Sequence, residues 1–83
     1  MADPNILAQE LAEMIGQILR KTIDPTRLDA LLVDDYGADS MDMVDIVESM
    51  ERKYGVVVDN EELQKLLSLA DVVRTVQEFQ AAA

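Results

Sequence analysis

The residue best suited to covalent chemistry in this chain is Ser40. The sequence of 83 residues contains no cysteine and no histidine, so serine–histidine and cysteine-based catalysis lack their usual base or nucleophile. Ser40 lies in the segment Tyr36-Gly37-Ala38-Asp39-Ser40-Met41-Asp42, after a glycine-containing loop and at the predicted start of an amphipathic helix. This placement favours a point of covalent attachment over a hydrolytic site.

Ser40 also has a structural interpretation, because serine is a common helix N-cap. Asp39 is an equally good N-cap, and since one cap is enough, Ser40 is left exposed in the first turn. An anion attached there would be favoured by the free N–H groups and the macrodipole of the helix, with Gly37 providing room. Asp39 and Asp42 would repel such an anion, and we interpret them as contacts for a basic modifying enzyme.

The elements around this segment are predicted to be helices. Asp3-Pro4 predicts the N-cap and first turn of a helix that continues to about Lys21. The following connection, residues 22–39, is long for a small domain, and we expect four aliphatic side chains to hold it on the core: Leu28, Leu31, Leu32 and Val33. A second helix is predicted from Ser40 to Tyr54, closed by Gly55.

The C-terminal part predicts two further helices. Asp59 caps a short helix through Leu66, and Ser68-x-x-Asp71 resembles a capping box that opens the last helix. The sequence therefore predicts an all-α fold, a small four-helix bundle with three main helices plus one short helix and a long loop between the first two main helices. We expect one domain, residues 1–83, ordered over about 3–80 with residues 81–83 frayed.

The predicted helix from Ser40 has two apolar faces. At about 100° per residue, one arc forms a core stripe, made of Met43, Ile46, Val47, Met50 and Tyr54. Met41 and Val44 fall instead on the flank that holds Ser40, together with Glu48 and Glu51. Apolar side chains edged by carboxylates beside an attachment serine indicate a docking surface for partners. The alternatives are contact with the preceding loop, or isolated exposed apolar residues, which are common.

The charge of the chain is concentrated near this helix. Residues 34–62 hold ten acidic and two basic residues, most of the net charge of −10. Such a field disfavours nucleic acid and anionic lipid and favours basic protein surfaces, although a solvated face would also explain it. The sequence has no apolar run of membrane-spanning length and no signal-peptide pattern. We therefore expect a monomeric cytoplasmic protein with no stable membrane insertion.

From Asp39 to about Val76 the order and spacing of these features resemble acyl carrier proteins. The segment Gly37-Ala38-Asp39-Ser40-Met41 is similar to that family's modification motif, Gly-x-Asp-Ser-Leu, with Met41 in place of leucine. The resemblance implies that a phosphopantetheinyl transferase attaches 4′-phosphopantetheine from coenzyme A to Ser40, and that the thiol of this arm carries acyl groups. The partners would be acyl-loading and acyl-transfer enzymes with basic docking surfaces.

The resemblance also assigns roles to residues around Ser40, and it places Asp39 with Ser40 among the cofactor-binding residues. Partner enzymes would contact the exposed side of the helix, at Asp39, Met41, Asp42, Val44, Asp45, Glu48 and Glu51. The bundle interior would shelter the acyl chain, with Ile46, Val47, Met50 and Leu66 as its lining. The chain would be a non-catalytic carrier in fatty acid, specialised lipid or polyketide biosynthesis.

Other functions remain as alternatives. A peptidyl or aminoacyl carrier usually shows Gly-Gly-x-Ser where this chain has Gly-Ala-Asp-Ser, and an unmodified acidic helical docking module would need no arm. An EF-hand starting at Asp34 fails, because its sixth residue is Asp39 instead of glycine and its twelfth is Asp45 instead of glutamate. We therefore expect no specific metal site, only weak binding of divalent cations to the clustered acids.

Overall fold

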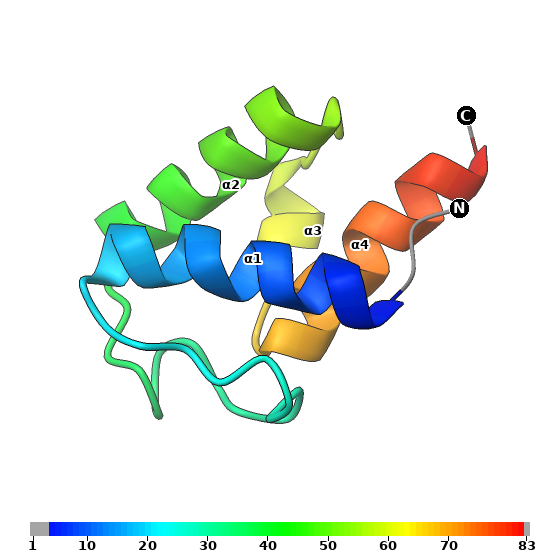
Figure 1. Cartoon of the computed structure of the whole chain (residues 1–83). Helices are drawn as coiled ribbons and strands as arrows, with labels where there is room; N and C mark the ends of the chain where they lie inside the picture. The colour runs from blue at the N-terminus through cyan, green and yellow to red at the C-terminus, as the bar shows by residue number, and fades with distance from the viewer. Residues whose placement is uncertain (1–3, 83) are drawn as a thin grey trace.

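Four helices make up the regular structure of the chain. The computed structural model describes residues 4–82, and within this range it contains α1 (Pro4–Leu19), α2 (Ser40–Tyr54), α3 (Asn60–Gln64) and α4 (Leu69–Ala82), with no strand. α1 packs against both α2 and α4. Figure 1 shows α1 and α2 running in opposite directions, with the long loop passing below α1 and returning to the start of α2. The prediction of an all-α fold with three main helices and one short helix is confirmed.

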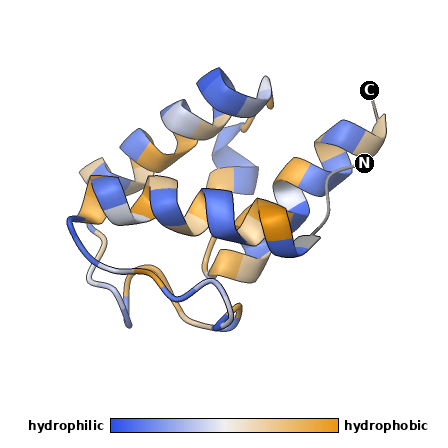
Figure 2. Ribbon diagram, in the orientation of Figure 1, coloured by the Kyte–Doolittle hydropathy of each residue, from blue (hydrophilic) through white to orange (hydrophobic). Residues whose placement is uncertain are grey.

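The core lies between the inner faces of the three main helices. Figure 2 shows hydrophobic and hydrophilic residues alternating along each of them, as expected for helices with one buried face. The largest completely buried side chains are Leu7, Leu11, Ile15, Leu32, Ile46, Met50, Val56, Leu69, Val72 and Val76. The predicted core stripe of α2 is correct, since Ile46, Val47 and Met50 are buried and Met43 and Tyr54 are half-buried against the core.

α1 ends two residues before the predicted position. Arg20 has φ 57°, a left-handed conformation that stops a helix, and the Lys21 N–H then donates to the Gly16 carbonyl at 3.0 Å. The predicted N-cap, Asp3, lies outside the described residues. Arg20 and Lys21 therefore follow the helix and do not belong to its last turn.

The long loop is held in a different way from the predicted one. Of the four aliphatic residues expected to hold it, only Leu32 is buried, whereas Leu28, Leu31 and Val33 are exposed. The buried side chains of Ile23, Leu32 and Ala38 anchor the loop in the core. Backbone hydrogen bonds also hold it, because it lies against the junction between α3 and α4. Leu32 N–H donates to the Leu67 carbonyl at 2.9 Å, Ala70 N–H to the Leu28 carbonyl at 2.8 Å, and Leu31 forms an isolated antiparallel bridge with Ser68.

The ends of α2 agree with the sequence, and those of α3 differ slightly. Gly55 closes α2 with φ 71°, and its N–H donates to the Glu51 carbonyl at 2.9 Å. α3 starts after the predicted cap, Asp59, but ends at Gln64 and not at Leu66. The N–H of Leu66 bonds to the Leu63 carbonyl at 3.2 Å, a tighter turn that places Leu66 in the core.

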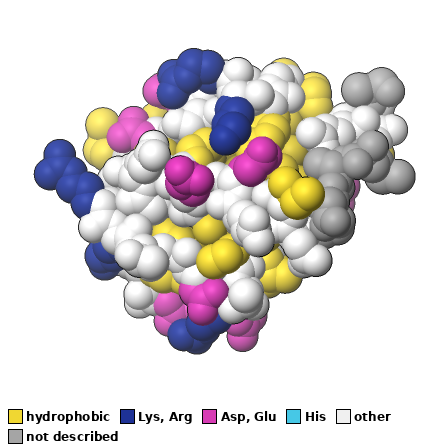
Figure 3. Space-filling view, viewed as in Figure 1, with side chains coloured by type: hydrophobic (Ala, Val, Ile, Leu, Met, Phe, Trp, Pro, Cys, Tyr) yellow, Lys and Arg dark blue, Asp and Glu magenta, His cyan; other side chains and the backbone are white. Residues whose placement is uncertain are grey.

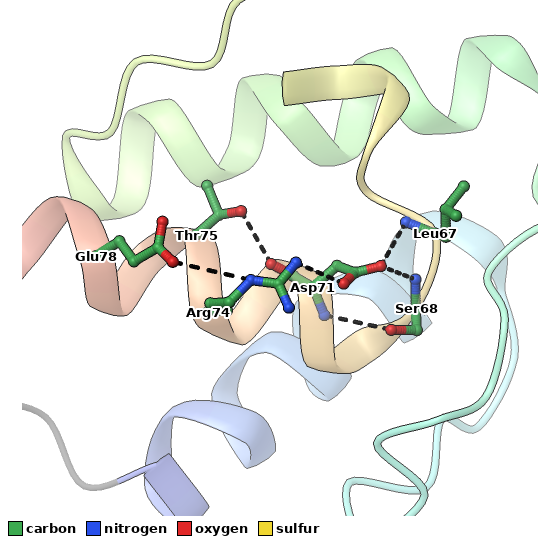
Figure 4. A network of polar contacts seen from close by, with 6 residues as sticks. All are labelled: Leu67, Ser68, Asp71, Arg74, Thr75 and Glu78. Atoms are coloured by element: carbon green, nitrogen blue, oxygen red, sulfur yellow. Dashed lines mark hydrogen bonds and ion pairs between the residues drawn. The ribbon is translucent and has the colours of Figure 1, made fainter. Parts of the chain in front are cut away.

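Asp71 organises the start of α4 (Figure 4). One carboxylate oxygen accepts the Leu67 and Ser68 N–H groups, both at 3.0 Å, and the other accepts the Arg74 guanidinium at 2.7 Å. The Ser68 hydroxyl accepts the Asp71 N–H at 3.3 Å in return, so the predicted capping box is confirmed. Partial burial opposes ionisation, but the Ser68 and Leu67 amides and the Arg74 guanidinium hold the pKa of Asp71 below its ordinary value.

α4 extends to Ala82, two residues beyond the end expected for the ordered chain. Ala81 and Ala82 continue the helix, and the expected fraying of residues 81–83 stays a prediction. Ala83 lies outside the described residues. An alanine-rich end is compatible with helix, because alanine has the highest intrinsic helix propensity.

A polar contact joins α1 to α2 on the outer side of the core. The Tyr54 hydroxyl donates to a Glu10 carboxylate oxygen at 3.4 Å. Partial burial, followed by the charge of Glu10, raises the pKa of Tyr54 to about 12. The phenol therefore remains protonated at physiological pH and keeps its donor for this contact.

Candidate functional site

A reciprocal capping box fixes the start of α2. Asp39 is extended (φ −99°, ψ −177°) and occupies the N-cap. Its Oδ1 accepts the Asp42 N–H at 2.8 Å, while Asp42 Oδ2 accepts the Asp39 N–H at 3.1 Å. Each carboxylate thus satisfies a backbone donor that a helix start leaves without a partner. The two acids nearest Ser40 have a structural role, in addition to any role in binding a basic enzyme.

Ser40 is the first residue of α2 and is exposed. Because Asp39 provides the cap, the Ser40 hydroxyl is not needed for it. Within residues 4–82 no hydrogen bond of this hydroxyl to another side chain or to the backbone is found. The sequence-based expectation for capping is therefore correct, and the hydroxyl is open to solvent at the positive end of the helix dipole.

The turn before Ser40 is compact. Gly37 has φ 73°, a conformation that favours glycine, and its N–H donates to the Val33 carbonyl at 2.9 Å. Ala38 is buried, and its N–H donates to the Leu32 carbonyl at 2.9 Å. The turn thus places Asp39 and Ser40 at the surface, directly after a residue that is anchored in the core.

The exposed side of α2 brings together most of the predicted docking residues. Met41 is 68% exposed and Val44 41%, so solvent and not the preceding loop meets much of both side chains. Asp45 and Glu48 are exposed on the same side, and Asp42 is half-buried in the capping box. An exposed methionine beside carboxylates suits a surface that meets several partners.

Glu51 differs from the other predicted docking residues. Its side chain is half-buried, and Oε2 accepts the Val58 N–H at 3.2 Å. This contact ties the end of α2 to the segment that leads to α3. The sequence did not reveal this role, because it depends on how residues 55–59 fold back beside the helix.

The four residues predicted to line an acyl-binding interior lie together in the core. Ile46 and Met50 are completely buried, Leu66 is 3% exposed and Val47 8%. None of the four lines the surface hollow between α3 and α4, of about 450 Å³, whose walls are Val56, Val57, Glu62, Lys65, Arg74, Thr75, Glu78 and Phe79. The apolar environment for an acyl chain is present, and the side chains pack against one another.

Acidic and basic side chains are mixed on the side of α1 but follow an order along α2. Figure 3 views the side of α1 and shows acidic and basic side chains scattered there, with apolar side chains between them. On α2, Asp42, Asp45 and Glu48 come first, whereas Arg52 and Lys53 lie beside Glu51 in the last turn, where the helix dipole favours cations. Within residues 4–82 there is no group of three or more acids close enough to hold a metal ion.

Lys21 reaches the site in a way that the sequence did not indicate. Its Nζ donates to the Tyr36 carbonyl at 2.6 Å, although the two residues are 15 positions apart.

Among the described residues, none of the helices has the length and apolar character that a membrane span requires.

Comparison with known proteins identifies the family. The family model described as a phosphopantetheine attachment site matches residues 9–76. The acyl carrier protein of Thermotoga maritima is 42% identical over 77 residues, covering 93% of this chain and 95% of the relative. Those of Akkermansia muciniphila (34% over 76 residues, 92% and 95% covered) and Campylobacter hominis (32% over 69 residues, 83% and 87% covered) are also similar. The chain belongs to the acyl carrier proteins, whose prosthetic group is 4′-phosphopantetheine.

Proposed function

We propose that Ser40 is the residue to which the 4′-phosphopantetheine arm of this acyl carrier is attached. The observation that carries the proposal is an exposed serine at the first position of α2, next to an aspartate that already provides the cap. When attached, the arm supplies a thiol that holds acyl groups as thioesters. The hydroxyl of the chain would form the phosphodiester bond as the pyrophosphate bond of coenzyme A breaks and adenosine 3′,5′-bisphosphate leaves. Backbone N–H groups at a helix start favour the resulting anion.

The residues around Ser40 would keep this hydroxyl in one place. The capping box of Asp39 and Asp42 prevents the first turn from unwinding, and the turn at Gly37 directs the chain into the helix. A substrate residue with a fixed position costs less conformational entropy when an enzyme binds it. The chain would thus present Ser40 in an ordered form to the transferase.

The exposed side of α2 would be the docking surface for partner enzymes. Met41 and Val44 would enter an apolar depression, while Asp45 and Glu48 would face basic side chains of the partner. The exposed carboxylate of Asp39 and the half-buried carboxylates of Asp42 and Glu51 would add to the negative field. The partners by this proposal are the phosphopantetheinyl transferase and the enzymes that load, transfer or extend the acyl group.

The core between α2 and Leu66 would shelter the acyl chain. Because Ile46, Val47, Met50 and Leu66 are packed together, the side chains have to move apart to admit it. Methionine suits such a position, since it has three rotatable bonds and a polarizable thioether. The chain itself would act as a monomeric, non-catalytic domain in the cytoplasm, where coenzyme A-dependent enzymes meet it.

Loading of Ser40 tests the proposal. The wild-type chain is incubated with coenzyme A and a broad-specificity phosphopantetheinyl transferase, in parallel with Ser40→Ala and with Ser49→Ala as the matched control. Intact mass should show one added phosphopantetheinyl group on the wild type and on Ser49→Ala, and none on Ser40→Ala. Circular dichroism checks that all three are folded. Loading of Ser40→Ala would overturn the assignment.

A further inference from the structure

The turn at the end of α1 places the side chain of Lys21 against the loop before Ser40. Arg20 takes the left-handed conformation, which turns the chain so that the Lys21 N–H bonds to the Gly16 carbonyl at 3.0 Å. A Cβ on Gly16 would lie only 2.6 Å from the Lys21 carbonyl oxygen. The backbone at Lys21 can therefore approach α1 only because residue 16 has no side chain.

The receiving loop has its own hydrogen bonds, and Lys21 adds one from outside. Tyr36, Gly37 and Ala38 donate their N–H groups to carbonyls of residues 31–33. The Tyr36 carbonyl accepts the Lys21 ammonium at 2.6 Å. A Cβ on Gly37 would lie 3.2 Å from the same nitrogen, so the ammonium lies against the backbone of the turn.

We propose that Lys21 is a positioning residue for modification: it clamps the turn at Tyr36–Gly37 to the end of α1 and so orders the approach to Ser40. The inference rests on the proposed attachment at Ser40. The ammonium does not take part in the chemistry. It reduces the freedom of the backbone that precedes Ser40, and thereby reduces the ordering that the transferase has to impose on binding.

The test compares Lys21→Met, Lys21→Arg and the wild type as substrates of the same transferase with coenzyme A. Lys65→Met is the matched control, because it removes one exposed lysine, at the end of α3, that in the described structure makes no contact with the loop before Ser40. We expect Lys21→Met to raise the KM for the carrier by about three- to tenfold with kcat unchanged, the range given by loss of one hydrogen bond. Lys21→Arg should raise KM less than Lys21→Met does, since a guanidinium also donates to a carbonyl.

Amide hydrogen exchange gives a second readout that needs no enzyme. In Lys21→Met, the amides of Gly37, Ala38 and Asp39 should exchange faster than in the wild type, while those in the middle of α4 should be unchanged. Unchanged exchange together with unchanged KM would overturn the proposal, and so would an equal rise of KM in Lys65→Met, which would show that the rise does not depend on the contact between Lys21 and Tyr36. Failure of the wild type to be loaded would overturn the assignment of Ser40, while the exchange experiment would still decide the role of Lys21.

Discussion

Two substitutions of Asp39 can separate its contribution as the N-cap of α2 from the contribution of its negative charge. Asparagine is about as good an N-cap as aspartate but carries no charge, whereas alanine provides neither. In the structure, one carboxylate oxygen of Asp39 accepts the Asp42 N–H at 2.8 Å, and the side-chain oxygen of asparagine can accept the same donor. Asp39→Asn should therefore retain most of the stability that Asp39→Ala loses.

The size of the loss follows from this one hydrogen bond at the start of α2. Replacing an N-cap aspartate by alanine costs about 1 kcal/mol of stability, within a range of roughly 0.5–2 kcal/mol. For a domain of 60–100 residues, 1 kcal/mol corresponds to a shift in Tm of about 4–8 °C. We therefore expect Asp39→Ala to lower Tm by about 4–8 °C, and Asp39→Asn to lower it by less than half as much.

Thermal unfolding followed by circular dichroism at the helix band gives the Tm of both variants. The loading rate of Ser40 on the same samples shows how much the charge of Asp39 contributes to recognition by the transferase. Asp39→Asn should reduce kcat/KM for loading about two- to fivefold at low salt, with a smaller effect at high salt, because exposed charges are screened. Equal losses of Tm in the two variants would refute the cap, since they would trace the stability to charge. An unchanged Tm in Asp39→Ala would refute it as well.

Three further predictions follow from particular contacts. Arg20→Gly should raise Tm by a few degrees, since a non-glycine residue with positive φ costs about 1 kcal/mol; a lowered Tm would contradict this. The pKa of Asp71 is lowered in the folded chain, so the stability that its carboxylate contributes is present above the unfolded pKa and lost as pH falls through the folded pKa. Asp71→Ala should therefore be less stable than the wild type at neutral pH. The difference in stability between the two should shrink in acid. The double variant Asp45→Lys with Glu48→Lys should reduce kcat/KM for loading and abolish its salt dependence. The control with the same change in net charge, Glu13→Lys with Glu78→Lys, should have a smaller effect. Equal effects of the two double variants would refute docking on α2.

The charge-reversal variant at Asp45 and Glu48 leaves Asp42 unchanged, for a reason that only the structure provides. From the sequence, Asp42 and Asp45 are both acids of the predicted docking surface. In the structure Asp42 accepts the Asp39 N–H, so a lysine at residue 42 would break the capping box and lower stability together with docking. Asp45 and Glu48 are exposed and change the charge alone.

The boundaries of α2 could be predicted from sequence because their signals are local. Asp39 and Gly55 flank the apolar stripe, and capping by an aspartate and closure by a glycine require only the neighbouring residues. The capping box of Ser68 and Asp71 was predictable for the same reason. Local signals thus predicted the helix that begins at Ser40, the proposed attachment residue, and the start of α4.

The long loop and the Lys21 contact could not be predicted, because they depend on segments far apart in the sequence. Leu31 and Leu32 are adjacent aliphatic residues, yet only Leu32 is buried, since the backbone pairing with the segment at Leu67–Ser68 decides which side chain turns inward. Lys21 and Tyr36 meet only after α1 has ended at a left-handed residue. The apolar residues proposed to shelter an acyl chain were also identifiable from sequence, but their packing was not.

The most direct test of the attachment at Ser40 is tandem mass spectrometry of the loaded wild-type chain after proteolysis. The phosphopantetheinyl group should be found on the single peptide that contains Gly37-Ala38-Asp39-Ser40, with fragment ions that place it on Ser40. A group located on Ser49 or Ser68, or a folded chain that the transferase leaves unmodified, would contradict the proposal that α2 begins with the attachment residue.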